Sequence, residues 1–123
     1  MTNNIDYPKS FQKHLKEIFK KFPRSKKRIT NEIENLAQNP LQGDSYPGFG
    51  ELEVRKIRMS LSEYNIGKSK GLRFIYLYLI LKNKIIPLAI YQKNKFAAED
   101  EIKRMLIDRI KEIAQEIKEQ QTI

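Results

Sequence analysis

The chain reads Val-Arg-Lys-Ile-Arg at 54–58, Gly-Lys-Ser-Lys-Gly at 67–71 and Leu-Arg-Phe-Ile-Tyr at 72–76. Two segments rich in β-forming residues therefore flank a loop of glycines and lysines. Successive residues of a strand point to opposite faces of its sheet, so Lys56 and Arg58 share one face. Arg73 repeats the cation on the following strand. Cations kept in register on neighbouring strands indicate a pocket for phosphate groups.

The N-terminal third of the chain has the apolar spacing of two short amphipathic helices. Residues 3–7 are expected to form a short edge strand before them. Pro8 suits a first helical position, and Pro23 ends the first helix. Ser25 is the expected N-cap of the second helix, which stops before Pro40. The two apolar faces comprise Phe11, Leu15, Ile18, Phe19 and Phe22, and then Ile29, Ile33, Leu36 and Ala37.

The middle of the chain predicts three strands, joined by loops at 40–50 and 60–71. The strands are expected at 52–59, 72–81 and 85–91. Residues 72–81 are apolar on both faces, which suits a central strand. The short turn that follows them implies antiparallel pairing with the next strand. Pro87 is unfavourable in a central strand, so that strand should be partly an edge or bulged.

A final amphipathic helix is expected from about 97 to 119. It contains seven acidic and five basic residues, a net charge of −2. Since the whole chain carries +9, the other residues carry +11, and the positive field lies on the helical hairpin and the sheet. The apolar positions of this helix are Ile102, Leu106, Ile110, Ile113 and Ile117.

The order β-α-α-β-β-β-α predicts a single α+β domain over residues 1–123. We expect a small antiparallel β-sheet with an N-terminal helical hairpin and a C-terminal helix, the helices packed on one side of the sheet. Tyr76 and Tyr78 share a face with Phe74, and we interpret all three as core residues.

Composition narrows the classes of partner and the compartment. A small chain with a net charge of +9 suits nucleic acid, an anionic membrane surface or an acidic protein. It has no cysteine, which excludes disulfides and thiolate zinc sites. The start lacks the pattern of a secretory signal, and the most apolar stretch, 72–81, is too short to span a bilayer. These observations permit a cytoplasmic protein, which we expect, and they predict no membrane-spanning segment.

The order of elements and the strand motifs resemble the RelE/ParE superfamily of type II toxins, with the greatest similarity to its RelE- and HigB-like messenger-RNA endonucleases. The resemblance covers roughly residues 5–110. It implies ribosome-dependent cleavage of messenger RNA in the A site, a cognate antitoxin and no metal cofactor. The matching motifs are Leu-Glu-Val-Arg-Lys-Ile-Arg at 52–58, Gly-Lys-Ser-Lys-Gly-Leu-Arg-Phe-Ile-Tyr at 67–76, and Ile-Tyr-Gln-Lys-Asn at 90–94.

Metal-independent RNA cleavage uses the neighbouring 2′-OH as the nucleophile, and it needs a base, an acid and stabilisation of the negative phosphorane. The only histidine, His14, lies outside the strand motifs, on a helix where we expect it to face solvent. Lys, Arg and Tyr are therefore the candidates. A cluster of cations stabilises the transition state, and it also lowers the pKa of a lysine that acts as a base. The expected catalytic set is Lys56, Arg58, Arg73, Tyr91 and Lys93.

These residues are expected to divide the chemistry between them. Arg58 and Arg73 would bind the scissile phosphate, because a guanidinium binds phosphate in a bidentate way. Lys56 is the candidate base or stabiliser of the activated 2′-OH. Tyr91 lies two residues before Lys93 and on the same face, where it would stack on a base or assist proton transfer. A solvated sheet face is the competing interpretation, and the repeat at Arg73 favours the functional one.

The expected RNA-binding set is Lys68, Lys70 and Arg55. Lys68 and Lys70 lie between Gly67 and Gly71, which serve either turn geometry or a phosphate cradle. Arg55 projects from the opposite face, where it would cover the helices or pair with an acid. The basic run at 24–28 is expected to be a solvated helix start that could touch ribosomal RNA. Neither a carboxylate pair nor a metal cluster stands out, so we expect no metal and no cofactor.

Two other functions stay open at this stage. The chain could be a ParE-like inhibitor of DNA gyrase, or a non-catalytic basic module that binds nucleic acid, because a fold does not fix a function. The basic strand residues favour the endoribonuclease. Its expected partners are messenger RNA, the ribosome and an acidic antitoxin that covers the basic face or displaces the C-terminal helix.

Overall fold

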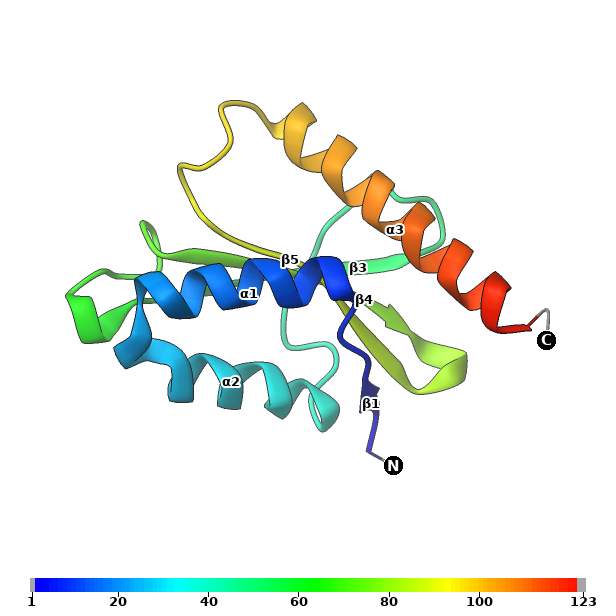
Figure 1. Cartoon of the computed structure of the whole chain (residues 1–123), viewed down its shortest axis with the longest axis horizontal. Helices are drawn as coiled ribbons and strands as arrows, with labels where there is room; N and C mark the ends of the chain where they lie inside the picture. Colours follow the sequence, from blue (N-terminus) through cyan, green and yellow to red (C-terminus); the bar gives the residue numbers. More distant parts are fainter. Residues whose placement is uncertain (1, 122–123) are drawn as a thin grey trace.

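The computed structural model describes the backbone of residues 2–121 and the side chains of residues 2–116. Within them the chain has an α+β fold, in which a five-stranded sheet lies between two layers of helix (Figure 1). The predicted fold class is confirmed. The helices are α1 (Lys9–Lys21), α2 (Lys26–Glu34) and α3 (Glu99–Gln121). The strands are β1 (Asn4–Ile5), β2 (Asp44–Ser45), β3 (Glu53–Met59), β4 (Leu72–Leu79) and β5 (Lys84–Gln92).

The sheet has the strand order β1-β5-β4-β3-β2. The pairs β2–β3, β3–β4 and β4–β5 are antiparallel, but β1 pairs with β5 in parallel. The sheet is therefore mixed rather than wholly antiparallel. The pairing of β1 is free of the constraint that a short hairpin would impose, because most of the chain separates it from β5. The strand β2 was not expected, since it lies in the predicted loop at 40–50.

The predicted central strand is confirmed, because β4 lies between β3 and β5 and six of its residues are buried in succession. It ends at Leu79 rather than at 81. A short 3₁₀ turn, η4 (Ile80–Lys82), follows it. Asn83 then adopts the left-handed conformation, with a φ of 50°. Asparagine is one of the few residues that tolerate this conformation, and here it turns the chain into β5.

The helices cover both faces of the sheet. On one face, α1 and α2 pack on residues such as Phe74 and Tyr76 of β4. On the other face, α3 packs Ile102 and Leu106 against alternate strand residues that include Leu77 (Figure 1). The expectation that all helices lie on one side is therefore wrong. A strand that is apolar on both faces needs cover on both, and the hairpin supplies only one layer. The side chain of Ile117, also expected on α3, lies outside the described residues.

A β-bulge interrupts β5 in the middle of the sheet. Ile75 pairs with Ala89 and Tyr76 pairs with Pro87, so Leu88 has no partner on β4. The extra residue shifts the alternation of side chains by one position, and residues beyond it change face. The prediction that the strand containing Pro87 is bulged is confirmed.

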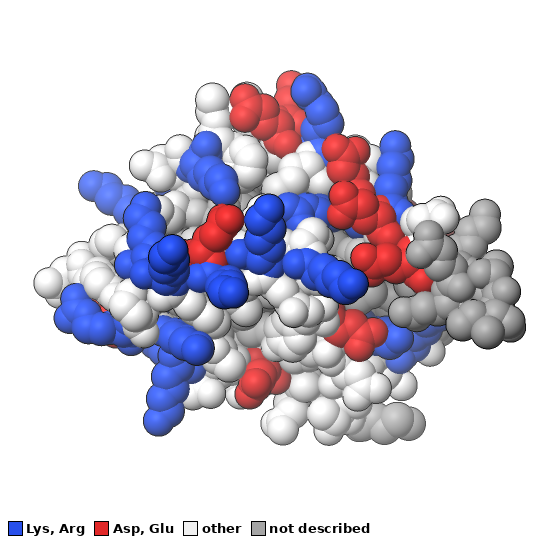
Figure 2. All heavy atoms as spheres, viewed as in Figure 1, with Lys and Arg blue, Asp and Glu red and all other residues white. Residues whose placement is uncertain are grey.

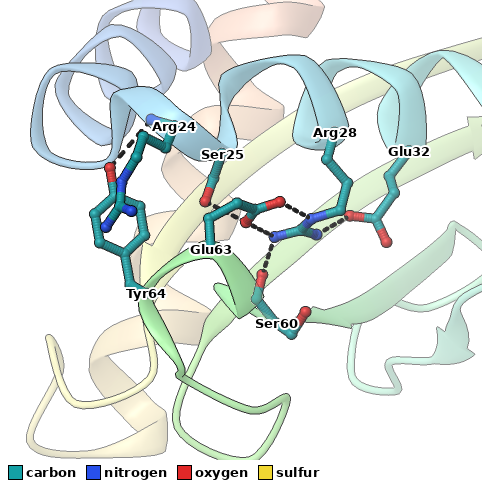
Figure 3. A network of polar contacts seen from close by, with 7 residues as sticks. All are labelled: Arg24, Ser25, Arg28, Glu32, Ser60, Glu63 and Tyr64. Carbon is teal, nitrogen blue, oxygen red and sulfur yellow. Dashed lines mark hydrogen bonds and ion pairs between the residues drawn. The ribbon is translucent and has the colours of Figure 1, made fainter.

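A polar network fixes the turn between α1 and α2 to the segment that follows β3 (Figure 3). Ser25 precedes α2 as predicted, but its hydroxyl donates to Glu63 Oε1 at 2.6 Å and not to the helix backbone. The Arg28 guanidinium donates to both carboxylate oxygens of Glu63 at 2.8 Å, and to the Ser60 carbonyl at 2.7 Å. Together with the Ser25 hydroxyl, it holds the pKa of Glu63 well below its usual range.

The basic run at 24–28 is therefore only partly solvated. Arg28 belongs to this network, and the Arg24 guanidinium lies 4.3 Å from the ring centre of Tyr64 (Figure 3). Tyr64 and Glu63 both belong to the short turn η3 (Ser62–Tyr64). The network thus holds the start of the 60–71 segment against the helical hairpin.

His14 connects the two helical layers. It is half-buried, and Arg109 Nη2 of α3 lies 3.2 Å from its Nε2 and 3.4 Å from its Nδ1. The expectation that His14 faces solvent is wrong. The reason is that Arg109 of α3, which covers the second face of the sheet, reaches His14 of α1 on the other side.

This contact makes stability depend on pH. Burial lowers the pKa of His14, and the charges of Arg109, Lys95 and Lys13 lower it further, while Glu17 raises it. Because the unfolded chain binds this proton more readily, the free energy of unfolding should fall as the pH drops from about 7 to about 5. Urea unfolding at the two pH values should show a smaller fall in His14→Gln than in the wild type. An identical fall in both proteins would contradict this assignment.

Candidate active site

Three residues form a row across the open end of the sheet. Arg58 of β3 pairs with Arg73 of β4, which pairs in turn with Tyr91 of β5. We call Arg58, Arg73 and Tyr91 the cross-strand row. All three lie on the face that α3 covers further along the sheet. The bulge at Leu88 is required for this arrangement, because without it Tyr91 would project toward the helical hairpin.

Arg73 is the buried centre of the row. It is 6% exposed, and its guanidinium donates to the carbonyls of Lys68, Ser69 and Leu72 at 2.9, 3.1 and 3.2 Å. Burial lowers the pKa of Arg73, and the charge of Arg58 lowers it further. An arginine nevertheless keeps its charge in proteins. The predicted bidentate grip on phosphate does not match this geometry, since carbonyls of the loop already take these donors.

The loop at 67–71 is held close to the sheet on its other side. A Cβ added to Gly71 would lie 2.2 Å from the Met59 carbonyl oxygen, so only glycine fits there without displacement. The Lys93 N–H donates to the Gly71 carbonyl at 3.0 Å. The Lys68 and Lys70 side chains remain exposed on this fixed loop. Of the two readings of the paired glycines, the structure favours tight backbone geometry at Gly71.

A shallow hollow of about 270 Å³ lies at the outer edge of β3. Three predicted cations, Lys56, Arg58 and Lys68, line it together with Asp44 of β2. Arg58 and Lys68 are exposed, and Lys56 is partly buried. The geometry therefore brings together residues that are distant in sequence and that carry the charge needed to hold a phosphate group.

Two residues that the sequence did not point to, Tyr46 and Glu99, connect α3 to Lys56, which lines this hollow. The ring centre of Tyr46 lies 5.1 Å from Lys56 Nζ, and the Tyr46 hydroxyl donates to the Glu99 carboxylate. Burial raises the pKa of Tyr46, and the bond to Glu99 raises it further, so this phenol stays protonated at neutral pH. The first turn of α3 is thus linked to the lysine on β3. Tyr46 lies in a loop of Pro and Gly, where no periodicity could have shown this pairing.

Tyr91 is too buried for the predicted stacking on an RNA base. It is 4% exposed, and its ring meets Phe96 edge-on at a centroid distance of 5.0 Å. Burial and the nearby Glu99 carboxylate raise the pKa of Tyr91 to about 12, while Arg73 opposes them. Such a phenol is a weak acid at neutral pH. Lys93 is exposed just beyond it.

Comparison with solved structures decides the fold. A mutant of the E. coli toxin RelE in the free state matches with a TM-score of 0.61 at 14% identity, covering 89% of this chain and 99% of that one. The isolated E. coli RelE toxin matches with a TM-score of 0.57 at 13% identity, covering 84% and 98% of the two chains. This chain has a RelE-like fold. No model of a protein family and no curated protein matches its sequence.

In this RelE-like fold Arg55 lies apart from the other candidates. Its Nε donates to the Gly43 carbonyl at 2.7 Å, Nη2 to the Leu41 carbonyl at 3.2 Å, and Nη1 pairs with Glu53. Arg55 therefore holds the 41–43 loop from the face opposite the cross-strand row. Its assignment to the RNA-binding set does not fit this position, and the expected pairing with an acid is found instead.

A second basic surface lies on α1. Figure 2 shows Lys and Arg side chains gathered over this helix on the face that is turned to the viewer. The five lysines of α1 are exposed, and four of them recur at a spacing that places them on one side of the helix. The RelE-like fold thus carries positive charge both at the end of the sheet and on its N-terminal helix. The five exposed lysines of α1 are Lys9, Lys13, Lys16, Lys20 and Lys21.

The close approach at Gly71 gives a sharp test of how the loop is held. Gly71→Ala should lower the free energy of unfolding by about 2 kcal/mol or more, because the new methyl group collides with the Met59 carbonyl. Gly67→Ala is the matched control in the same loop, since its Cβ would meet nothing within 4 Å. That variant should change stability by less than about 1 kcal/mol. Equal effects in denaturant unfolding would show that the loop is not held at Gly71.

Proposed function

We propose that this chain is the toxin of a type II toxin–antitoxin pair, and that it cuts messenger RNA in the ribosomal A site without a metal. The observation that carries the proposal is the convergence of Lys56, Arg58 and Lys68 on one hollow beside the cross-strand row. A gyrase inhibitor would not need cations from two separate segments arranged around a space for phosphate. The RelE-like fold is consistent with a toxin of this kind.

In the proposed reaction the scissile phosphate lies in the hollow at β3. The substrate's 2′ oxygen attacks phosphorus, the bond from phosphorus to the 5′ oxygen breaks, and a 2′,3′-cyclic phosphate forms. The leaving 5′ oxygen takes up a proton from solvent water, so that a free 5′-OH is released. Arg58 binds the phosphate oxygens through its planar guanidinium, and Lys68 adds a second charge. Lys56 takes the proton from the 2′-OH, or stabilises the oxygen as that proton leaves. The exposed Lys70 and Lys93 bind the flanking backbone.

The proposal gives Arg73 and Tyr91 structural roles in place of the expected direct contacts with RNA. Arg73 orients the loop that carries Lys68, and its buried charge contributes a positive potential under the site. Tyr91 packs beside it in the cross-strand row. The described residues that line the hollow include no histidine, and in this proposal catalysis depends on electrostatics and on orientation of the RNA. That dependence fits a need for the ribosome, for which the lysines of α1 offer a docking surface.

An acidic antitoxin would neutralise these basic surfaces, and a cytoplasmic location follows from a ribosomal target. None of the described helices has the length and apolar character needed to cross a membrane. Co-expression with the protein encoded beside this gene would test the pairing. Growth arrest that persists at full expression of that protein would refute it.

The decisive test is cleavage of a defined messenger RNA in reconstituted translation, with and without ribosomes. Wild-type protein should cut within codons only when ribosomes are present. Arg58→Ala should reduce the rate by at least about a hundredfold, because one charge-stabilising donor is lost. Lys82→Ala, which alters an exposed lysine at the opposite end of the sheet, should leave the rate unchanged.

Growth arrest in cells without any cleavage would overturn the proposal and favour a gyrase-type target. Binding of RNA that weakens with salt but is never followed by cleavage would instead indicate a non-catalytic module.

A further inference from the structure

A second and deeper hollow, of about 330 Å³, lies beyond the other end of the cross-strand row. Tyr91 forms one wall of it, and Ile18 and Ile90, both nearly buried, provide an apolar floor. Its polar lining comes from α1, from the end of β5 and from the segment after it. These polar residues are His14, Glu17, Lys21, Gln92, Asn94 and Lys95. We refer to it as the β5 pocket.

The fold builds this pocket by leaving the edge of β5 open. The strand β1 pairs only with Lys84 and Ile85, and within residues 2–121 no other strand covers the rest of that edge. The helices α1 and α3 meet beside it through His14 and Arg109. At the other side, Lys21 Nζ donates to Gln92 Oε1 at 2.6 Å, which fixes the Gln92 side chain and leaves its amide N–H groups available.

The lining matches the parts of a nucleotide. A flat base needs an apolar surface, which the floor of Ile18 and Ile90 supplies, and Tyr91 borders that floor as a buried wall that does not stack on the base. The amides of Gln92 and Asn94 and the carboxylate of Glu17 are groups that read the hydrogen-bonding edges of bases. Lys95 carries a charge suited to a phosphate. The volume falls within the range of small-molecule sites, which begins at about 300 Å³.

The position of the pocket relates it to the proposed cleavage site. The hollow at β3 and the β5 pocket flank the cross-strand row on opposite sides. Two strand spacings separate β3 from β5, which is about 10 Å. An RNA strand laid across the end of the sheet would therefore reach both.

We propose that the β5 pocket binds one nucleotide of the RNA, with its base on the apolar floor and its phosphate toward Lys95. This inference rests on the proposed function only in that the nucleotide belongs to the strand that is cut. It adds a site that selects the sequence around the cut, formed by residues of α1 and the end of β5.

Binding can be tested on the intact protein without ribosomes. His14 is the only histidine in the chain, so its imidazole signals in a ¹H–¹³C spectrum report on this pocket without ambiguity. Each of the four nucleoside 5′-monophosphates is titrated, with inorganic phosphate as a separate arm. The proposal expects a saturable shift of the His14 signals with at least one nucleotide, and a much weaker response to phosphate. No shift with any nucleotide, or an equal response to phosphate, would overturn it.

Matched variants locate the ligand. Lys95→Gln and Asn94→Ala should each weaken nucleotide binding by at least about fivefold, since each removes one polar contact. Lys82→Gln makes the same change of charge at a distant exposed site and should bind as the wild type does. Equal losses in Lys95→Gln and Lys82→Gln would refute the pocket. Cleavage is measured separately. If the protein binds nucleotides but cuts no RNA, the proposed function is wrong and the nucleotide pocket stands.

Discussion

The site at the end of the sheet depends on one buried guanidinium. Arg73 lies on the central strand with an acid on neither side of it, since Arg58 and Tyr91 are its neighbours in the row. Burying a charge is costly unless hydrogen bonds compensate it. Here the compensation comes from backbone carbonyls of Lys68, Ser69 and Leu72. The same bonds that satisfy the arginine fix the loop that presents lysines to the hollow.

The bulge in β5 and the packing of α3 place the other residues of the site around Arg73. The bulge at Leu88 turns Tyr91 to the face of Arg73, and so completes the cross-strand row. The helix α3 covers the rest of that face, and the Tyr46–Glu99 hydrogen bond secures its first turn next to Lys56. The end of the sheet that α3 leaves uncovered is therefore where charge can meet a ligand.

The sequence predicts the elements well because their signals are local. Helical spacing located α1 and α2, and the doubly apolar stretch located the central strand. Register on neighbouring strands also placed Arg58 beside Arg73. The predictions that failed concern contacts between residues that are far apart in the sequence. The side of the sheet chosen by α3, the contact of His14 with Arg109, and the pairing of Tyr46 with Glu99 join residues far apart in the chain. No periodicity records such contacts.

Burial also changes the roles of residues whose positions were predicted correctly. Arg73 was expected to meet phosphate, and it lies at the expected place, but its donors face the loop. A sequence pattern gives the face of a residue, whereas its partners depend on how closely a loop returns to the sheet. Gly71 allows the 67–71 loop to approach the sheet closely, because it has no Cβ to collide with the Met59 carbonyl.

The central claim is that Arg73 builds the site rather than touching the RNA, and Arg73→Lys tests it most directly. Amide hydrogen exchange in the 67–71 loop and the rate of ribosome-dependent cleavage would be measured on the same protein, beside Arg58→Lys. The account predicts faster exchange and slower cleavage together in Arg73→Lys, and slower cleavage with unchanged exchange in Arg58→Lys. Loss of cleavage in Arg73→Lys with the loop exchanging as in the wild type would contradict it, because Arg73 would then act on the RNA itself.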